Sequence, residues 1–375
     1  MRIGITCYPT YGGSGAVATE LGMALAQRGH EVHFVTYKLP FRLQQFLPRV
    51  HFHEVDVGRY PLFEFPPYDL ALAVRMHEVV RDHKLDVLHC HYAIPHATSA
   101  WIAKEMLLKE GSDVAVVTTL HGTDITIVGQ DPSFHSITKF SIEKSDALTA
   151  VSTYLQQETL SAFGCTACRI EVIPNFVDPA VYDRSRYDDT LRAQLGGGRK
   201  VLMHISNFRP VKRVVDIVRI FASVNRVIPS VLVMVGDGPE RQTAEHEARE
   251  LGVEQHVQFL GKIEQVAPLL AAADLFLLPT DVESFGLSAL EALACGTPVI
   301  GSAAGGLPEV VRSGETGILR PVGDVDGMSS AGIEILGSPS NWGAMSRAAA
   351  ADARDRFSMN DIVPRYEDFY TLATS

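Results

Sequence analysis

The sequence predicts an α/β protein with two doubly wound domains, each a parallel sheet covered by helices. Short apolar runs alternate with helical stretches along the chain, and the alternation restarts after residue 199. Most of these runs are continuously apolar, which is typical of strands covered on both faces. The length of 375 residues allows two domains of ordinary size, each with its own core.

The first domain is expected to span residues 1–175. Alternating strands and helices favour a parallel sheet, because parallel neighbours need crossover connections. Its strands are predicted at 2–8, 31–37, 50–57, 86–92, 115–120, 147–152 and 170–174. Its main helices are predicted at 16–28, 70–83, 97–109 and 154–163.

The second domain, expected at 176–356, repeats this plan after a linker at 174–199 that is rich in Asp and Arg. An amphipathic helix is predicted at 360–373. Two such domains in tandem are expected to form a cleft where the carboxyl ends of their strands face each other. The strands of the second domain are predicted at 200–206, 231–236, 257–261, 275–279 and 298–301.

The composition limits the classes of partner. Hydrophobic residues make up 46% and charged residues 21%, as in a globular protein. A formal charge of −11 argues against nucleic acid, because binding phosphates requires clustered Lys and Arg. The same charge argues against docking on an anionic membrane, and no apolar run approaches the ~18 residues of a membrane span.

The N-terminus and the cysteines indicate a cytoplasmic protein. The chain enters a strand at once, without the apolar core and cleavage site of a signal peptide. Cys7, Cys90 and Cys295 fall in apparent core segments, which fits reduced, buried thiols. Cys165 and Cys168 form a C-x-x-C without a second pair, so a surface loop is expected there rather than a zinc or redox site.

The stretch 281–301 carries two carboxylates around a short predicted helix at 286–294. Glu283 lies just before the first turn, where backbone N–H groups and the helix dipole favour an anion. Glu291 is the only charged residue between Ser284 and Pro308. A carboxylate in so apolar a helix requires a hydrogen-bonding partner. The alternative to a ligand-binding role is that Glu283 only caps the helix and that Glu291 is only a buried structural acid.

The segment ESFGLSALEALACGTPVI, followed by GGLPEV, resembles the signature of the retaining GT-B glycosyltransferases of family four. The resemblance implies two Rossmann-like domains, with a C-terminal helix at about 357–375 that packs back on the first domain. It also implies that Glu283 contacts the hydroxyls of the donor sugar and that Glu291 holds the nucleotide ribose. The donor's sugar or phosphates would then meet the stretch Ser284, Phe285, Gly286 and Leu287.

A loop rich in cations is expected after the strand at 200–206. Arg209 and Lys212 suit a diphosphate, whose developing charge they would neutralise as the nucleotide leaves; Asn207 lies beside them. The family usually has Gly-Arg and then Lys-Gly here. Lys212 matches that pattern, whereas Arg209 is displaced from it. A solvated loop is the alternative.

Gly13, Ser14 and Gly15 follow the first strand and open a helix. They match the G-x-G-x-x-A dinucleotide fingerprint. A nicotinamide enzyme would also need an acidic residue at the end of the second strand, which instead reads Thr36-Tyr37-Lys38. We therefore expect the backbone N–H groups of this loop to approach an anionic ligand. Gly13 would contact the phosphates of the donor substrate, and Ser14 would contact a carboxylate of the acceptor substrate. A plain tight turn is the alternative.

Histidines cluster near the strand ends of the first domain. His89 and His91 are expected to be structural, because no carboxylate or thiol spacing completes a metal set. His121 opens an HG-type loop, and the resemblance implies that it lies against the reacting sugar. Tyr92 and Thr119 are further acceptor-side candidates.

Several stretches resemble one branch of the family over nearly the whole chain, among them LPFRLQQF, HCHYAIPHA, TTLHGTDIT and HISNFRPVKRV. That branch moves N-acetylglucosamine from UDP-N-acetylglucosamine to the hydroxyl of L-malate, the first step of bacillithiol biosynthesis. The resemblance implies catalysis without a metal, by front-face attack, and leaves a homodimer open. His121, Glu283, Lys212 and Arg209 are the catalytic candidates, and Arg209 is also the candidate cation for the acceptor.

Three alternatives remain open on the sequence alone. They are a family-four enzyme with another soluble acceptor, a UDP-sugar epimerase of GT-B fold, and a sensor of sugar nucleotides that is not an enzyme.

Overall fold

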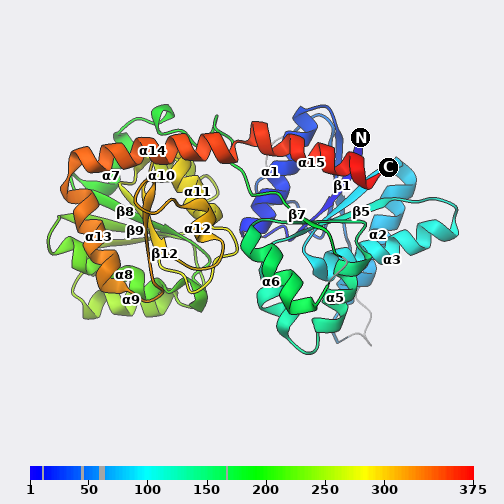
Figure 1. Cartoon of the computed structure of the whole chain (residues 1–375), viewed down its shortest axis with the longest axis horizontal. Coiled ribbons are helices and arrows are strands. Elements are labelled where there is room, and N and C mark those ends of the chain that lie inside the picture. The colour runs from blue at the N-terminus through cyan, green and yellow to red at the C-terminus, as the bar shows by residue number, and fades with distance from the viewer. Residues whose placement is uncertain (11, 44–45, 59–63, 166–167) are drawn as a thin grey trace. The chain divides into compact units, whose positions relative to one another are not determined.

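A computed structural model describes the chain except for residues 11, 44–45, 59–63 and 166–167. The chain divides into two compact units. Unit 1 is Met1–Pro174 with Ile362–Ser375, and unit 2 is Asn175–Asp361. Each unit contains one parallel sheet with helices on both of its faces (Figure 1), which confirms the predicted α/β, doubly wound fold.

The sheet of unit 1 has the strand order β3-β2-β1-β4-β5-β6-β7, and every neighbouring pair is parallel. The order reverses between β1 and β4, so the chain builds the sheet outward in both directions from there. Its strands are β1 (Arg2–Thr6), β2 (Glu31–Thr36), β3 (Val50–Glu54), β4 (Val87–His91), β5 (Ala115–Leu120), β6 (Ala147–Ala150) and β7 (Ile170–Val172).

The helices of unit 1 include α15, which is far from the others in the sequence. The Tyr370 hydroxyl of α15 lies 2.7 Å from Nδ1 of His89 in β4. Arg28, just after α1, donates to Glu367 of α15 at 2.7 and 2.9 Å. The helices are α1 (Gly13–Gln27), α2 (Tyr68–His83), α3 (Thr98–Lys109), α4 (Thr123–Thr126), α5 (His135–Lys144), α6 (Thr153–Phe163) and α15 (Met359–Ala373), with a π-helical turn at Ala93–Ala97.

The sheet of unit 2 has the order β10-β9-β8-β11-β12-β13, again with every neighbouring pair parallel. The sequence analysis missed its last strand, β13, which is only four residues long. The strands are β8 (Lys200–Ile205), β9 (Ser230–Val235), β10 (Val257–Gly261), β11 (Leu275–Leu278), β12 (Val299–Ser302) and β13 (Gly317–Arg320).

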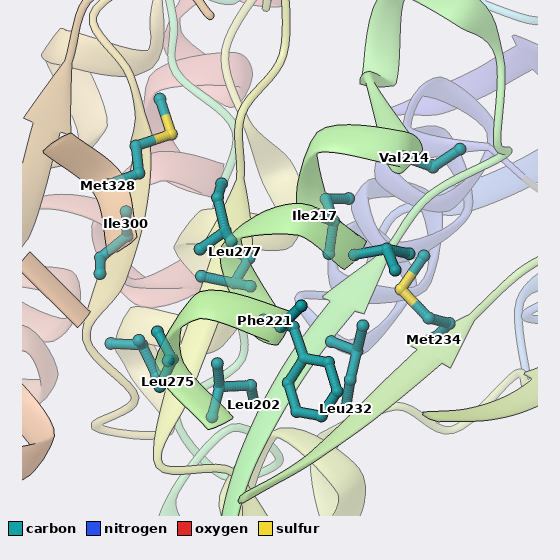
Figure 2. Close-up of a cluster of buried hydrophobic side chains, with 14 of the residues drawn as sticks. Leu202, Val214, Ile217, Phe221, Leu232, Met234, Leu275, Leu277, Ile300 and Met328 are labelled. Carbon is teal, nitrogen blue, oxygen red and sulfur yellow. The ribbon is translucent and has the colours of Figure 1, made fainter. Parts of the chain in front are cut away.

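The core of unit 2 forms because α8 presents one apolar face to the sheet. Val214, Ile217 and Phe221 recur at helical spacing and are fully or almost fully buried. They pack in one cluster with side chains from β8, β9, β11 and β12 (Figure 2). The helices of unit 2 are α7 (Thr190–Gly196), α8 (Val214–Asn225), α9 (Arg241–Glu250), α10 (Ala267–Ala272), α11 (Leu287–Ala294), α12 (Leu307–Val310), α13 (Val325–Gly337) and α14 (Pro339–Phe357).

The prediction of a linker at 174–199 was wrong, because this segment packs on unit 2. Tyr182 is only 6% exposed. The Arg184 guanidinium donates to the carbonyls of Cys295 and Ala273 at 3.0 and 2.6 Å. Its polar composition therefore reflects hydrogen bonding to helix and strand ends.

The cysteines follow the prediction in part. Cys7, Cys90 and Cys295 are free and buried, as expected. Cys165 is also buried, and it forms a disulfide with Cys168. The two Cα atoms lie 5.5 Å apart, within bridging distance.

No helix in the described part of the chain is long and apolar enough to cross a membrane.

Candidate active site

An ion pair marks the point where the strand order of unit 2 reverses. Lys212 follows β8 and Glu283 follows β11, the two strands between which the order changes. Lys212 Nζ lies 2.6 Å from Glu283 Oε2, with the two side chains 19% and 15% exposed. Ligands of open α/β sheets bind at this switch point, outside the carboxyl ends of the strands.

Backbone contacts hold the loops of Lys212 and Glu283 together. The Thr280 hydroxyl and the Asp281 N–H both donate to the Val211 carbonyl, at 2.8 and 2.9 Å. Arg213 donates to Asp281 Oδ1 at 2.9 Å. The ion pair therefore sits on a fixed frame.

Glycine in the GGLPEV stretch makes room for Glu283. Gly305 has a φ of 60°, and a Cβ there would lie 2.1 Å from the Glu283 carbonyl oxygen. The next residue, Gly306, donates its N–H to that same oxygen at 2.7 Å. Only glycine at position 305 allows this approach, so the stretch positions the Glu283 backbone.

Helix α11 begins beside this pair with an open N-terminus. Its N-cap residue is Gly286, with a φ of 99°, which has no side chain of its own to cap the helix. Backbone N–H groups in the first turn of a helix favour an anion. Phe285 is 3% exposed and packs edge-on against Phe357, so its ring belongs to the core and only its backbone can meet a ligand.

Glu291 lies on the buried face of α11. It is 3% exposed, and the Tyr182 hydroxyl donates to its Oε1 at 2.7 Å. The sequence indicated that this carboxylate needs a partner but did not identify it as Tyr182, which lies in a polar segment 109 residues away.

A buried histidine, His204, supports the loop after β8, and the sequence analysis also missed it. Burial lowers the pKa of His204 to about 3, so its ring is neutral. Its Nδ1–H donates to the Leu277 carbonyl at 2.8 Å, which leaves Nε2 to accept from the Ser206 hydroxyl at 2.7 Å. Beyond Ser206, Asn207 and Arg209 are exposed. The Arg209 guanidinium has no ion pair with any residue that the structure describes.

In unit 1, Tyr92 and His121 lie together at the carboxyl ends of β4 and β5, with ring centroids 5.5 Å apart. His121 Nε2 lies 2.8 Å from His91 Nδ1. Burial lowers the pKa of His121 to about 3, so it is a neutral imidazole. A neutral ring can donate or accept a hydrogen bond but brings no charge to a ligand.

Asp124 holds these two loops in place. Its buried carboxylate accepts N–H groups from Ala93 at 3.0 Å and from Gly122 at 2.9 Å. One side chain thus joins the segments after β4 and β5. The sequence analysis missed this role, because the contact with Ala93 joins segments 31 residues apart.

Thr119 lies inside the sheet. It has no exposed surface, and its hydroxyl contacts His89 Nε2 and Thr149 Oγ1, both at 2.7 Å. Direct contact with an acceptor would require this network to open. His89 is bonded through both ring nitrogens, as expected for a structural histidine.

Gly13 and Ser14 begin α1 after β1, next to β4 at the switch point of unit 1. Gly13 is exposed and Ser14 is half-buried. A Cβ on Gly15 would lie 2.4 Å from the Tyr8 carbonyl oxygen, which explains the glycine at that position. The structure thus groups Gly13, Ser14, Tyr92 and His121 on loops of neighbouring strands.

Comparison with known proteins agrees with this geometry. Residues 11–181 match the family model described as Glycosyltransferase Family 4, and residues 189–354 match that of Glycosyl transferases group 1. The chain is 48% identical over 372 residues to N-acetyl-alpha-D-glucosaminyl L-malate synthase of Bacillus anthracis, covering 99% of this chain and 96% of that protein. It is 30% identical over 316 residues to a GDP-mannose-dependent alpha-(1-6)-phosphatidylinositol monomannoside mannosyltransferase of Mycolicibacterium smegmatis, covering 80% of each.

Solved structures share the fold. Sucrose-phosphate synthase from Thermosynechococcus elongatus superposes with a TM-score of 0.80 at 23% identity, over 99% of this chain and 98% of that one. Anabaena Alr3699/HepE, solved in complex with UDP-glucose, gives 0.77 at 22% identity over 100% of both chains. Because the two family models match successive halves and a relative matches nearly the whole length, the chain belongs to the family 4 glycosyltransferases, with the GT-B fold.

Proposed function

We propose that this glycosyltransferase moves N-acetylglucosamine from UDP-N-acetylglucosamine to the hydroxyl of L-malate, with retention at the anomeric carbon. The 48% identity to the Bacillus anthracis synthase over 99% of the chain carries this choice of substrates. The ion pair at the switch point of unit 2 supports a site for a charged sugar nucleotide there.

In this proposal unit 2 holds the donor. Glu291 accepts the ribose hydroxyls, and Tyr182 fixes the orientation of its carboxylate. Glu283 accepts hydroxyls of the sugar, while the open N-terminus of α11 at Gly286 and the Lys212 ammonium receive the diphosphate. Exposed Asn207 and Arg209 extend the same edge.

Unit 1 holds the acceptor. L-malate carries two carboxylates, which need donors rather than acceptors. The N–H groups at the start of α1 near Ser14 and the Tyr92 hydroxyl supply such donors. His121, being neutral, donates or accepts one hydrogen bond beside the reacting sugar without repelling or attracting the carboxylates.

The transfer step requires no enzyme nucleophile in this scheme. The bond between the anomeric carbon and the β-phosphate oxygen breaks, and the malate hydroxyl oxygen bonds to that carbon from the same face. The hydroxyl proton passes to the departing phosphate oxygen. Lys212 stabilises the charge that develops on the diphosphate, and we propose that no metal takes part.

A product assay tests the proposal. Purified protein is incubated with UDP-N-acetylglucosamine, with and without L-malate, and the products are separated by mass and by NMR of the anomeric proton. We expect an α-linked glycoside of malate and UDP in equal amounts. An epimerised sugar nucleotide without malate would indicate an epimerase, and an intact donor in both reactions would indicate a sensor. Transfer to other hydroxy acids but not to malate would retain the transferase and reject the acceptor.

A further inference from the structure

Four histidines and one glutamate lie together at one edge of the sheet in unit 1, apart from the carboxyl-end loops that carry Tyr92 and His121. Glu31 is the first residue of β2 and His33 lies two residues on, so both side chains are on one face. His51 pairs with His33 in the register between β2 and the edge strand β3. His53 lies on the same face as His51, and His83 ends α2 with its ring 4.6 Å from that of His33.

Three of these side chains have the spacing of metal ligands. Glu31 Oε1 lies 3.4 Å from His33 Nε2 and 3.3 Å from His51 Nε2. Ligand atoms bound at about 2.0–2.2 Å on a tetrahedral zinc ion lie roughly 3.3 Å apart. All three ligand atoms are within 4.8 Å of one another. A carboxylate oxygen and two imidazole nitrogens thus surround a common point.

The environment of His33 points to an ion at that position. His33 has no exposed surface, and its Nε2 makes no hydrogen bond among the described residues. Its other nitrogen, Nδ1, lies 2.9 Å from His53 Nε2. If Nδ1 carries the proton and donates to His53, the Nε2 lone pair faces the Glu31 carboxylate with no donor between them. A buried lone pair and a carboxylate in this arrangement attract a cation.

We propose that Glu31, His33 and His51 bind one divalent transition-metal ion, of which zinc is the best match. Imidazole nitrogen with one carboxylate oxygen suits zinc rather than calcium or magnesium, which take oxygen ligands. His53 is the positioning residue, since a ligating histidine commonly donates its second N–H to a partner that fixes the ring. The ion joins β2 to the edge strand β3 and stabilises that edge.

A second triad in the same cluster is less suitable. His33, His53 and His83 also place ligand atoms within 4.8 Å of one another. However, the 2.9 Å between His33 Nδ1 and His53 Nε2 is a hydrogen-bond distance, shorter than the roughly 3.3 Å spacing on tetrahedral zinc. His33 belongs to both triads, so substitutions of His51 and of His83 distinguish the two possible sites.

Calorimetric titration of the metal-free full chain with zinc chloride tests the site. We expect one zinc ion per chain, and His51→Ala should weaken its affinity at least about tenfold. His51 is 45% exposed, so this change leaves the core intact. The matched control is His246→Ala, an exposed histidine on α9 of unit 2, which should leave the affinity unchanged. Calcium chloride should give no binding at this site.

Three outcomes would overturn the assignment. A stoichiometry below one zinc ion per chain would contradict the proposed site. Equal zinc affinities for the wild type and His51→Ala would place the ion elsewhere. A larger loss in His83→Ala than in His51→Ala would move the ion to the second triad. A thermal melt supplies an independent readout: zinc should raise the melting temperature of the wild type but not that of Glu31→Gln.

Discussion

At the scale of single residues, Lys212 and Glu283 form an ion pair in which Nζ and Oε2 lie 2.6 Å apart. Both are only partly exposed, so separating them costs more than separating a surface pair. A bound donor would exchange this contact for two others, with its diphosphate on the ammonium and its sugar hydroxyls on the carboxylate. Substitutions of the two glutamates should therefore affect UDP and the complete donor differently.

We expect Glu291→Ala to weaken UDP and UDP-N-acetylglucosamine alike, because the ribose contact is common to both. The loss of a charged hydrogen bond is worth roughly 1.5–3 kcal/mol, or about 10- to 150-fold. Glu283→Gln should weaken the complete donor more than UDP, since the proposal places this carboxylate against the sugar and its neutralisation frees Lys212 for the diphosphate. Calorimetry with both ligands measures the difference. Equal losses of UDP affinity in the two variants would contradict this division of roles.

Substitution of Arg209 tests whether this residue binds the acceptor. Its guanidinium is exposed and makes no ion pair within the described residues, so it is available to an anionic ligand. Arg209→Ala should raise the KM for malate at least tenfold, about the effect of one charged hydrogen bond, and change UDP affinity little. Steady-state kinetics and calorimetry give the two quantities. A variant that loses UDP affinity and keeps its malate KM would assign Arg209 to the diphosphate.

At the scale of elements, the site of unit 2 depends on close approaches between loops. Glycines let the loop after β9 approach that after β8: a Cβ on Gly238 would lie 2.0 Å from the Asn207 carbonyl oxygen. Gly305 does the same for Glu283. These contacts involve backbone, which cannot move aside as the end of a flexible side chain can. Each glycine therefore positions the residue that it touches.

Gly305→Ala should displace Glu283 and lower kcat/KM by about 100-fold or more, as a misplacement of 1 Å can do. Gly314→Ala is the matched control, because Gly314 also has a positive φ, of 93°, but a Cβ there meets nothing within 4 Å. It should cost stability of roughly 1–2 kcal/mol and leave kcat/KM within about twofold. Similar kinetics for the two variants would show that the approach to Glu283 is not needed.

At the scale of the whole molecule, both units bury neutral histidines. His89 in unit 1 and His204 in unit 2 have no exposed surface, and burial lowers the pKa of each from 6.5 to about 3. The unfolded chain binds protons at these residues near pH 6.5, whereas the folded chain does not. Their contribution to stability is therefore complete above pH 6.5 and is lost as the pH falls toward 3.

The free energy of unfolding should consequently be lower at pH 5.5 than at pH 7.5. One pKa unit is worth about 1.4 kcal/mol, so these two histidines together predict a decrease of roughly 2–3 kcal/mol over this interval. Urea titrations at the two pH values measure it. An unchanged free energy would mean that the folded chain takes up the protons as readily as the unfolded chain.

Chelation separates the proposed zinc site from catalysis. With cationic side chains neutralising the diphosphate, EDTA should leave turnover within about twofold. The same treatment should lower the melting temperature if zinc joins β2 to β3. Turnover that disappears in EDTA and returns with added metal would show that the transfer step needs an ion.

The sequence by itself determined the fold class and most of the elements. Continuous apolar runs between helical stretches are sufficient to predict buried parallel strands, because only such strands are apolar on both faces. Helix α11, with Glu283 before it and Glu291 within it, was also predicted from the sequence, because the residues that indicate this helix lie within the segment itself. Strand β13 was missed because a run of four residues carries too little periodicity.

Tertiary structure alone decided the partners of these residues. No sequence pattern joins Tyr182 to Glu291, Asp124 to Ala93 or His33 to His51, because each contact depends on which strands become neighbours and in what register. Strand order likewise follows from packing between distant segments. The sequence therefore supplied the chemistry of the side chains, and the sheet topology brought those side chains within reach of one another.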